Sequence, residues 1–347
     1  MRIYSVIFLV LVQLLQPLMA DEKKHGVMLG VQTSEKPHWF KESFLEFEDD
    51  VAEAAEAGKR VMLYFHQEGC PYCAKLVDEN FANPQTEAYV RQHFDGITIN
   101  MWGDREVVSV AGQSFTEKTF AAALKVQYTP TLVFLDERGK VALRLNGYYP
   151  PDQLQAALRY VAEKRETKQK FSDFVLASKT QSTGSLIGEG FFQQTDRLDQ
   201  LVGQEGKPLA VFFEAANCQD CQIMHEKILV DAPTRRLVES MHNVQFDVRS
   251  KQSITAPNGQ QTTVSDWVKS LDIGYTPSVV FFDKNGVEVM RIAGFIKTFH
   301  FQSVFAYVKE AAYLSEPSFQ RYISRRSEEI REAGYDTDIF GYQSSHP

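Results

Sequence analysis

The chain has 347 residues, of which 44% are apolar and 24% are charged. These proportions are typical of a folded globular protein with about two ordinary domains, and they exclude disordered and collagen-like classes. The net charge is −8, with acidic and basic residues interspersed. Because no basic stripe runs along the sequence, we expect no nucleic acid among its partners.

The first twenty residues predict a targeting segment. Arg2 precedes an apolar run over residues 3–19, and Ala20 stands directly before a charged cluster that begins at Asp21. This order favours a secretory signal peptide, residues 1–20, that is cleaved on export, and it leaves an uncleaved membrane anchor as the alternative. We therefore expect export to an oxidising compartment, where cysteines tend to be paired.

An internal repeat divides the rest of the chain. The run 63–65 leads to Cys70 as the run 211–213 leads to Cys218, at an offset of 148, and Tyr-Thr-Pro recurs at 128–130 and 275–277. Matches at nearly one offset indicate duplication of a domain-sized unit, which is too long for a solenoid repeat. We predict a first unit over residues 21–163, a linker over 164–189, a second unit over 190–314 and a C-terminal helical tail over 315–347.

Both units have the same predicted order of elements. In the first unit we expect helices at 44–57, from the cysteines to about 80, after Asn83–Pro84, at 117–125 and at 151–163. The strands are expected at 61–65, 97–102, 131–136 and 141–145, with counterparts at 209–213, 244–248, 278–283 and 288–292. This order predicts an α/β fold in which each unit has a central mixed sheet covered by helices on both faces.

Aromatic residues recur in the segments that follow the two units. Phe171 and Phe174 follow the first unit, and Phe319 and Tyr322 stand at the corresponding place after the second. Large aromatic side chains at such positions are expected to be buried in a packing contact. We predict that each pair docks its tail onto its own unit.

Four cysteines, arranged as two Cys-x-x-Cys pairs, carry the predicted chemistry. Each pair follows an apolar strand and opens a helix, where free backbone amides and the positive end of the helix dipole stabilise a thiolate. The thiolate attacks a disulfide, and a second thiol one turn deeper can then release the partner. We predict Cys70 as the nucleophile and Cys73 as the resolving thiol, with Cys218 and Cys221 in the same roles.

A Thr–Pro pair precedes a later strand in each unit. We predict that both of these peptide bonds are cis and that the two loops lie beside the cysteines. Because a proline has no amide hydrogen, backbone groups of its neighbour stay free to pair with a substrate strand, and the position is closed to a metal-ligating side chain. The predicted substrate contacts are Pro71, Tyr72, Thr129, Pro130, Thr276 and Pro277.

Two other uses of cysteine pairs are open from the residues alone. One is a permanent structural disulfide, although closing a four-residue loop constrains the unfolded chain least. The other is zinc held by four thiolates, but 144 residues separate the two pairs and place them in different predicted units. We therefore predict no metal site.

The two cysteine pairs differ in the charge between their sulfurs. The first pair encloses two uncharged residues, whereas the second encloses Asp220. A nearby negative charge disfavours a thiolate. We therefore predict that Cys218 is less acidic than Cys70 and that the second disulfide is harder to reduce.

Other polar and aromatic residues near the cysteines have weaker patterns. His66 and Glu214 end equivalent strands, where either could pass protons to the resolving thiol, but side chains at such positions are commonly only partly exposed and have no catalytic role. We expect His225 on a helix surface, and we expect Trp102 and Tyr148 to be core or groove aromatics.

Both units resemble the thioredoxin-like superfamily, in the branch near the bacterial disulfide isomerases and the SoxW-type periplasmic thioredoxins of sulfur-oxidation gene clusters. The residues that carry the resemblance are 63–73 and 129–134, and it extends over residues 39–162 and, more loosely, 191–312. The resemblance implies a dithiol–disulfide oxidoreductase whose first cysteine attacks and whose cis-proline loop holds the substrate. It implies no soluble cofactor.

The sequence departs from cytosolic thioredoxins in two places. They have tryptophan directly before the first cysteine, where this chain has Gly69 and Asn217. They also have a buried aspartate six residues before that cysteine, where this chain has Tyr64 and Phe212. Proton transfer to the resolving thiol must therefore follow a different route.

The leading prediction is an exported oxidoreductase that exchanges disulfides with proteins or sulfur compounds, in connection with sulfur oxidation. Its expected partners are thiol or disulfide-bonded proteins of the periplasm, with a membrane protein as a candidate electron donor. The alternative is a chaperone-like binding module whose second unit has lost redox turnover and holds partners. Copper delivery is disfavoured by the proline loops and by the lack of methionine-rich stretches.

Overall fold

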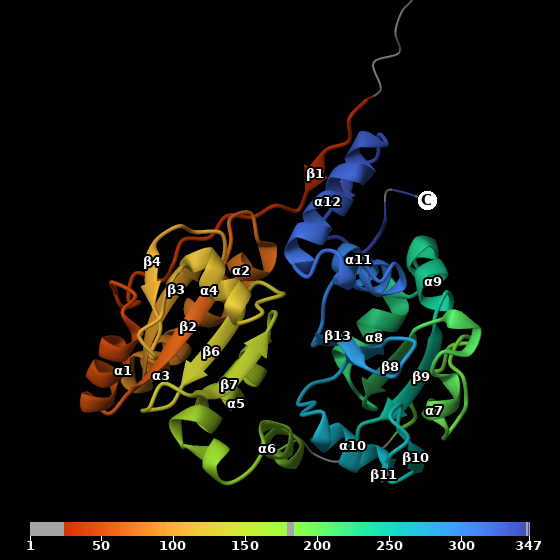
Figure 1. Ribbon diagram of the computed structural model, residues 1–347, viewed down its shortest axis with the longest axis horizontal. Helices are drawn as coiled ribbons and strands as arrows, with labels where there is room; N and C mark the ends of the chain where they lie inside the picture. The colour runs from red at the N-terminus through yellow and green to blue at the C-terminus, as the bar shows by residue number, and fades with distance from the viewer. Residues whose placement is uncertain (1–23, 179–183, 345, 347) are drawn as a thin grey trace, which may run out of the picture.

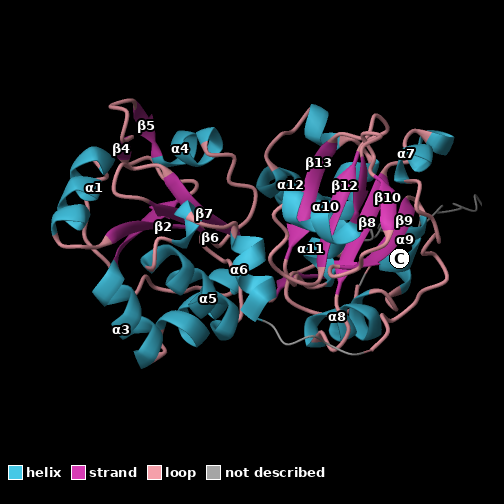
Figure 2. Cartoon of the chain, turned by 90° about the horizontal axis from the view of Figure 1, so that it is seen from below, coloured by secondary structure: helices cyan, strands magenta, loops and turns pink. Residues whose placement is uncertain are grey.

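The computed structural model describes residues 24–178, 184–344 and 346 (Figures 1 and 2). The predicted signal peptide, residues 1–20, lies outside these residues. Within the described part of the chain, no helix is long and apolar enough to cross a lipid bilayer. Two α/β units follow one another, which confirms the predicted fold class.

Each unit is built on a four-stranded mixed sheet. The strands of the two sheets are β2 (Arg60–His66), β3 (Phe94–Asn100), β6 (Thr131–Leu135) and β7 (Val141–Asn146), then β8 (Leu209–Glu214), β9 (His242–Asp247), β12 (Ser278–Phe282) and β13 (Glu288–Ala293). The first sheet has the order β3-β2-β6-β7, with β2 parallel to β3 and antiparallel to β6. The second sheet has the equivalent order β9-β8-β12-β13, with the same directions.

Helices cover both faces of each sheet. Those of the first unit and its tail are α1 (Phe47–Glu56), α2 (Pro71–Lys75), η1 (Leu76–Phe81), α3 (Pro84–His93), α4 (Glu117–Ala123), α5 (Pro151–Ala162), η2 (Arg165–Thr167) and α6 (Phe171–Ser178). Those of the second unit and its tail are α7 (Leu198–Leu201), η3 (Gln204–Gly206), α8 (Gln219–Ile223), η4 (Met224–Ile228), α9 (Ala232–Glu239), α10 (Val264–Ser270), α11 (Thr298–Lys309), η5 (Ala312–Leu314) and α12 (Phe319–Glu332).

The helix after each cysteine pair is continued by a π-helical segment. The α-helical turns α2 and α8 pass directly into η1 and η4, so the predicted helix from the first pair extends to Phe81. The next helix begins as expected from its sequence, because the side chain of Asn83 accepts a hydrogen bond from the backbone N–H of Gln85 at 2.9 Å and Pro84 occupies the first turn.

Strand alternation produces a separate core on each face of the sheets. In β2, Met62 and Tyr64 belong to the cluster that contains both cysteines, whereas Leu63 and Phe65 belong to the cluster on the opposite face. The same alternation divides β8 between its two clusters. Burial on both faces explains why these strands read as continuous apolar runs in the sequence.

One predicted strand needs correction in its bounds. The second strand of the first unit is Phe94–Asn100 and not 97–102, because Phe94 is buried and pairs with Arg60 at the start of β2. Each unit also has a short antiparallel hairpin that the sequence did not predict. It is formed by β4 (Glu106–Val108) and β5 (Ser114–Thr116) in the first unit and by β10 (Ser253–Thr255) and β11 (Gln261–Thr263) in the second.

The tails of the two units cross over to the opposite unit. Phe171 of α6 contacts Tyr160 of its own unit, with ring centroids 5.1 Å apart, and Tyr275 of the second unit at 5.6 Å. In the same way Phe319 of α12 contacts Tyr307 of its own unit at 5.3 Å and Tyr128 of the first unit at 5.4 Å. The predicted contact of each tail with its own unit is confirmed. The contacts of both tails with the opposite unit were not predicted from the sequence.

The two ends of the described chain meet beside α12. Strand β1 (Met28–Leu29) pairs in parallel with β14 (Thr337–Asp338), and Figure 1 shows β1 alongside α12 at the top of the molecule. A backbone hydrogen bond of 2.9 Å from Gly26 to Arg331 fixes the same contact. This brings the N-terminal segment, the C-terminal segment and α12 together above the first unit's α2.

Candidate functional site

The four cysteines form two disulfides, Cys70–Cys73 and Cys218–Cys221, at the first turns of α2 and α8. We call them site one and site two. In each, the first cysteine is the N-cap residue, and its Sγ accepts a hydrogen bond of 3.1 Å from the backbone N–H of the second. These sulfurs therefore lie where the helix dipole and free amides favour a thiolate in the reduced state.

The residue before each first cysteine has a left-handed backbone conformation. Gly69 has φ +70° and Asn217 has φ +59°. Glycine and asparagine are the residues that adopt this conformation most readily, which gives a local reason why glycine and asparagine, and not tryptophan, precede the first cysteines. The turn directs the first cysteine onto the helix N-terminus.

Both Thr–Pro peptide bonds are cis, as predicted from the sequence. In site one, the Sγ of Cys70 lies 3.6 Å from the carbonyl oxygen of Thr129. In site two, Thr276 lines the same cavity as Cys218. The proline of each pair, Pro130 or Pro277, is buried.

Tyr72, between the cysteines of site one, is buried against the second unit. Its hydroxyl accepts a hydrogen bond of 2.7 Å from the backbone N–H of Lys297. Its ring makes edge-to-face contacts with His300 and Phe340, each with centroids 5.1 Å apart. The turn that carries the cysteines of site one is therefore part of the interface with the second unit. Pro71, next to Tyr72, is also buried.

A cavity of about 500 Å³ lies above Cys70. The turn of site one and the loop of Thr129 form its floor. Its walls come from α11, α12 and the segments around β1 and β14. The wall residues that matter below are Val31, Ile296, Phe299, Ile323, Ser324 and Ile339.

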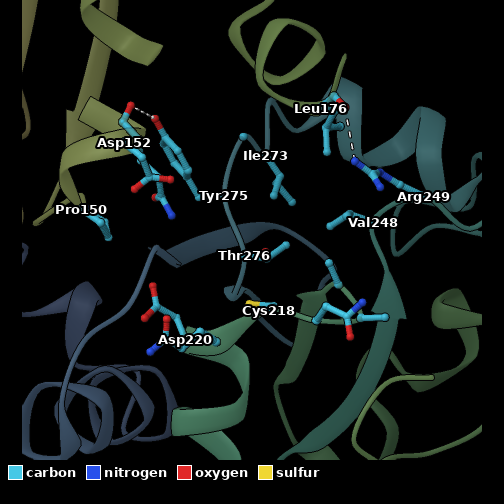
Figure 3. A pocket seen from close by; sticks show the side chains of 16 residues that line it. Pro150, Asp152, Leu176, Cys218, Asp220, Val248, Arg249, Ile273, Tyr275 and Thr276 are labelled. Carbon is cyan, nitrogen blue, oxygen red and sulfur yellow. Dashed lines mark hydrogen bonds between the residues drawn. The ribbon is translucent and has the colours of Figure 1, made fainter. Parts of the chain in front are cut away.

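A second cavity, of about 720 Å³, lies above Cys218 (Figure 3). Its walls come from α5 and α6 of the first unit and from the loop of Thr276. Unlike the first cavity it contains several charged side chains, which are Asp152, Asp220 and Arg249. Figure 3 shows Tyr275 and Ile273 opposite the sulfur, and Asp220 on the same side as the sulfur.

A buried ion pair lies behind site two, and the sequence analysis missed it. Glu214 and His225 are 1% and 2% exposed, and Nε2 of His225 lies 3.0 and 3.2 Å from the two carboxylate oxygens. Glu189 lies 3.2 Å from Nδ1, and Gln245 donates to Glu214 at 3.0 Å. The expectations of a surface His225 and a partly exposed Glu214 are therefore wrong.

This pair changes the titration of His225. Burial lowers the pKa of His225, but hydrogen bonds and charges of Glu214 and Glu189 outweigh that effect and raise the pKa above its ordinary value. Glu214 ends β8 on the same face as Phe212, and His225 lies one turn beyond Cys221 in the helix that covers this face. The pair is thus built on the face of the sheet that also carries the resolving cysteine.

The first unit has no such pair at the equivalent positions. His66 is only partly exposed, as expected, and burial lowers its pKa although Glu117 acts in the opposite direction. Val77 stands where the second unit has His225, at the offset of 148. The two sites therefore differ in the groups available to handle protons.

Trp102 and Tyr148 lie at the rim and in the wall of site one. Trp102 is 38% exposed, and its indole N–H donates to Gln67 at 2.7 Å. Tyr148 lines the cavity above Cys70 and donates a hydrogen bond to Glu79. Both are groove aromatics, as the sequence predicted. Among the described residues, no group of three or more His, Cys, Asp or Glu side chains is arranged to hold a metal ion.

The sheet order, the disulfide at a helix N-terminus and the neighbouring Thr–Pro loop occur twice, and together they define a protein of thioredoxin fold with two cysteine pairs arranged for thiol–disulfide exchange. The chain belongs to the thioredoxin-like domain family, whose model matches residues 47–162 and again residues 197–309. Among curated proteins, the comparison gave no match.

Three similar solved structures each match about one third of this chain. A thioredoxin-fold protein from Helicobacter pylori is 24% identical over 37% of this chain and 86% of its own, with a TM-score of 0.31. A thioredoxin from Thermus thermophilus is 26% identical over 34% of this chain and 85% of its own, with a TM-score of 0.29. The C-terminal domain of DsbD from Neisseria meningitidis, in its reduced form, is 20% identical over 32% of this chain and 90% of its own, with a TM-score of 0.26.

Proposed function

We propose that the protein is an exported protein thiol–disulfide oxidoreductase, of reductase or isomerase type, that exchanges disulfides at both sites. One observation carries this proposal: in each unit the first cysteine caps a helix and shares its surroundings with a Thr–Pro loop. An N-cap sulfur favours the thiolate, which is the attacking species in exchange. The expected partners are proteins of the periplasm that contain thiols or disulfides.

The exchange proceeds in two displacements. In the reduced protein, the thiolate of Cys70 attacks one sulfur of a substrate disulfide, the substrate S–S bond breaks, and the departing thiolate takes up a proton. The thiolate of Cys73 then attacks Cys70 Sγ and releases the second substrate thiol. Two electrons pass from the protein dithiol to the substrate, and the Cys70–Cys73 disulfide remains, as in the structure. An external dithiol regenerates the reduced protein.

Insulin reduction and refolding of a scrambled disulfide protein test this function. The variants are Cys70→Ser, Cys218→Ser and the double variant, each compared with the wild type. We expect each single variant to lose part of the turnover and the double variant to lose nearly all of it. Unchanged turnover in the double variant would overturn the proposal, and loss with Cys70→Ser alone would favour a binding role for the second unit.

A trapping experiment identifies the natural substrate. In Cys73→Ser the first displacement can occur but the second cannot, so the mixed disulfide on Cys70 accumulates. Mass spectrometry of the trapped species from cells would show whether the partner is a protein or a small sulfur compound. The latter result would support a role connected with sulfur oxidation.

The proposed export depends on residues 1–20, with their single positive charge and apolar run. Mass spectrometry of the protein purified from a periplasmic extract should give a mature N-terminus at Asp21. A protein that retains Met1 and stays with the membrane fraction would favour the uncleaved anchor. A membrane protein is our candidate for the electron donor in this compartment.

A further inference from the structure

Each site is walled by the opposite unit, through equivalent elements. The cavity of site one contains Phe299 of α11 and Ser324 of α12. The cavity of site two contains Asp152 of α5 and Leu176 of α6, which are the equivalent positions at the repeat offsets of 147 and 148. The two sites therefore have the same construction, and their chemistry differs because the wall residues differ.

The wall of site one is apolar. Its side chains include Ile296, Ile323 and Ile339, and among the described lining residues Glu68 is the one carboxylate. Burial lowers the pKa of His300 to about 4, so its imidazole carries no charge at neutral pH. An anionic group that enters this cavity would lose its hydration without finding a charged partner among the described lining residues, and a cationic group would find one carboxylate, the exposed Glu68.

Access to Cys70 is narrow. The side chain of Cys70 is 5% exposed, and Tyr72 beside it is held by the backbone of Lys297. Gln67 and Gln320 of α12 both line the cavity, and Gln320 accepts a hydrogen bond of 2.8 Å from Gln67. A sulfur buried at the floor of a cavity is more accessible to an extended chain, which can enter the cavity, than to a broad folded surface. Cys218, by contrast, is only half-buried.

We propose that site one selects an extended peptide segment with apolar residues beside its cysteine, and that walls supplied by the second unit set this preference. The inference rests on the proposed function, because the reaction is the same attack of the Cys70 thiolate on the substrate disulfide. The apolar flanks lie against the isoleucine and phenylalanine wall, which places the substrate sulfur next to Cys70. The size of the cavity is in the range that holds a small ligand or a few residues.

The test uses the full chain with Cys218→Ser and Cys221→Ser, so that only site one reacts. Three disulfide-linked peptide pairs of equal length carry a fluorophore on one half and a quencher on the other, with cysteine flanked by Leu and Phe, by two Asp, or by two Lys. Mixing with the reduced protein in stopped flow gives a second-order rate constant for each. We expect the apolar pair to react about tenfold faster than both charged pairs, which corresponds to about 1.4 kcal/mol.

Charge variants on α12 assign the preference to the wall. Ser324 is exposed at the cavity, so Ser324→Lys and Ser324→Asp add charge with little risk to folding. We expect Ser324→Lys to speed the Asp-flanked pair relative to the Lys-flanked pair about threefold or more, and Ser324→Asp to do the reverse. The matched control is Glu332→Gln, at the exposed end of the same helix and outside the cavity. It makes the net charge more positive by one unit, as Ser324→Lys does, and should leave the ratio of the rate constants for the Asp-flanked and Lys-flanked pairs unchanged.

The outcomes distinguish failure of the proposed peptide preference from failure of the proposed thiol–disulfide exchange. Equal rate constants for the three peptide pairs would overturn the preference and leave thiol–disulfide exchange intact. A folded protein disulfide that reacts as fast as the apolar peptide would overturn the requirement for an extended segment. No reaction of this reduced variant with any of the three peptide pairs would overturn the proposed exchange at site one itself.

Discussion

Glu214→Gln tests whether the buried pair behind site two is held by charge. The substitution keeps the shape and one acceptor oxygen but removes the negative charge that faces His225 at 3.0 Å. Glu189 still lies 3.2 Å from the other ring nitrogen, so the imidazole keeps one charged partner. Gln245, which donates to Glu214 at 3.0 Å, can also keep its hydrogen bond. The substitution therefore removes the charge of Glu214 and leaves the other contacts of His225 in place.

The size of the expected loss in the free energy of unfolding follows from the burial of Glu214 and His225. Removing one partner of a buried ion pair costs about 3–5 kcal/mol, and the retained hydrogen bonds place the expected loss at about 2–3 kcal/mol in the free energy of unfolding at pH 6. The folded-state pKa of His225 is raised, so its contribution is fully present below the unfolded pKa of about 6.5 and is lost as pH rises through the folded pKa. At pH 9 we expect a cost below about 1 kcal/mol.

The assay needs a probe in the second unit. The chain has three tryptophans, and Trp267 packs against Phe213 in the core of that unit, with ring centroids 5.4 Å apart. In a background of Trp39→Phe and Trp102→Phe, fluorescence during urea unfolding reports this unit alone. The matched control is Glu226→Gln, an exposed residue of η4, the helical segment that also carries His225. It should cost less than about 0.5 kcal/mol in the free energy of unfolding. An equal cost of Glu214→Gln at pH 6 and pH 9 would refute a charged pair.

Three further substitutions have defined outcomes. Asp220→Asn should lower the thiol pKa of reduced Cys218, seen as about two- to fivefold faster alkylation at pH 6, and an unchanged rate would remove Asp220 as the source of the asymmetry. Tyr72→Phe leaves the part-buried N–H of Lys297 without its acceptor, so urea unfolding should show a loss of about 1–3 kcal/mol in the free energy of unfolding. Phe319→Ala should cost about 3–5 kcal/mol and speed limited proteolysis of α12, whereas an unchanged digest would contradict the crossed packing.

The fold and the cysteine sites are predictable because their signals are local. An apolar strand followed by Cys-x-x-Cys and a helix is a pattern of neighbouring residues, and it is present around Cys70 and again around Cys218. The Thr–Pro pair before a later strand is equally local, and the fixed offset between the two copies supports each identification with the other. The asymmetry in acidity predicted for Cys70 and Cys218 stays a prediction.

The buried pair of Glu214 and His225 depends on contacts that no local pattern contains. Its other partners come from the segment before the second unit and from β9, far away in the sequence. A signal was nevertheless present, because Glu214 continues the alternation of Ala210 and Phe212 on one face of β8. A carboxylate at an inward position with a histidine one turn after the resolving cysteine could have predicted an ion pair.

The crossed tails show the limit of periodicity as evidence. The aromatic residues of α6 and α12 predict that these helices are buried, but periodicity does not distinguish the tail's own unit from the neighbouring one. Tyr128 and Tyr275, which receive the tails, directly precede the Thr–Pro loops. Because each loop that faces a cysteine is packed beneath the other unit's tail, duplication has made each site out of parts of both units. The two sites can therefore differ in substrate while keeping the same cysteine geometry, since the selecting residues and the reacting sulfurs lie in separate copies of the repeat.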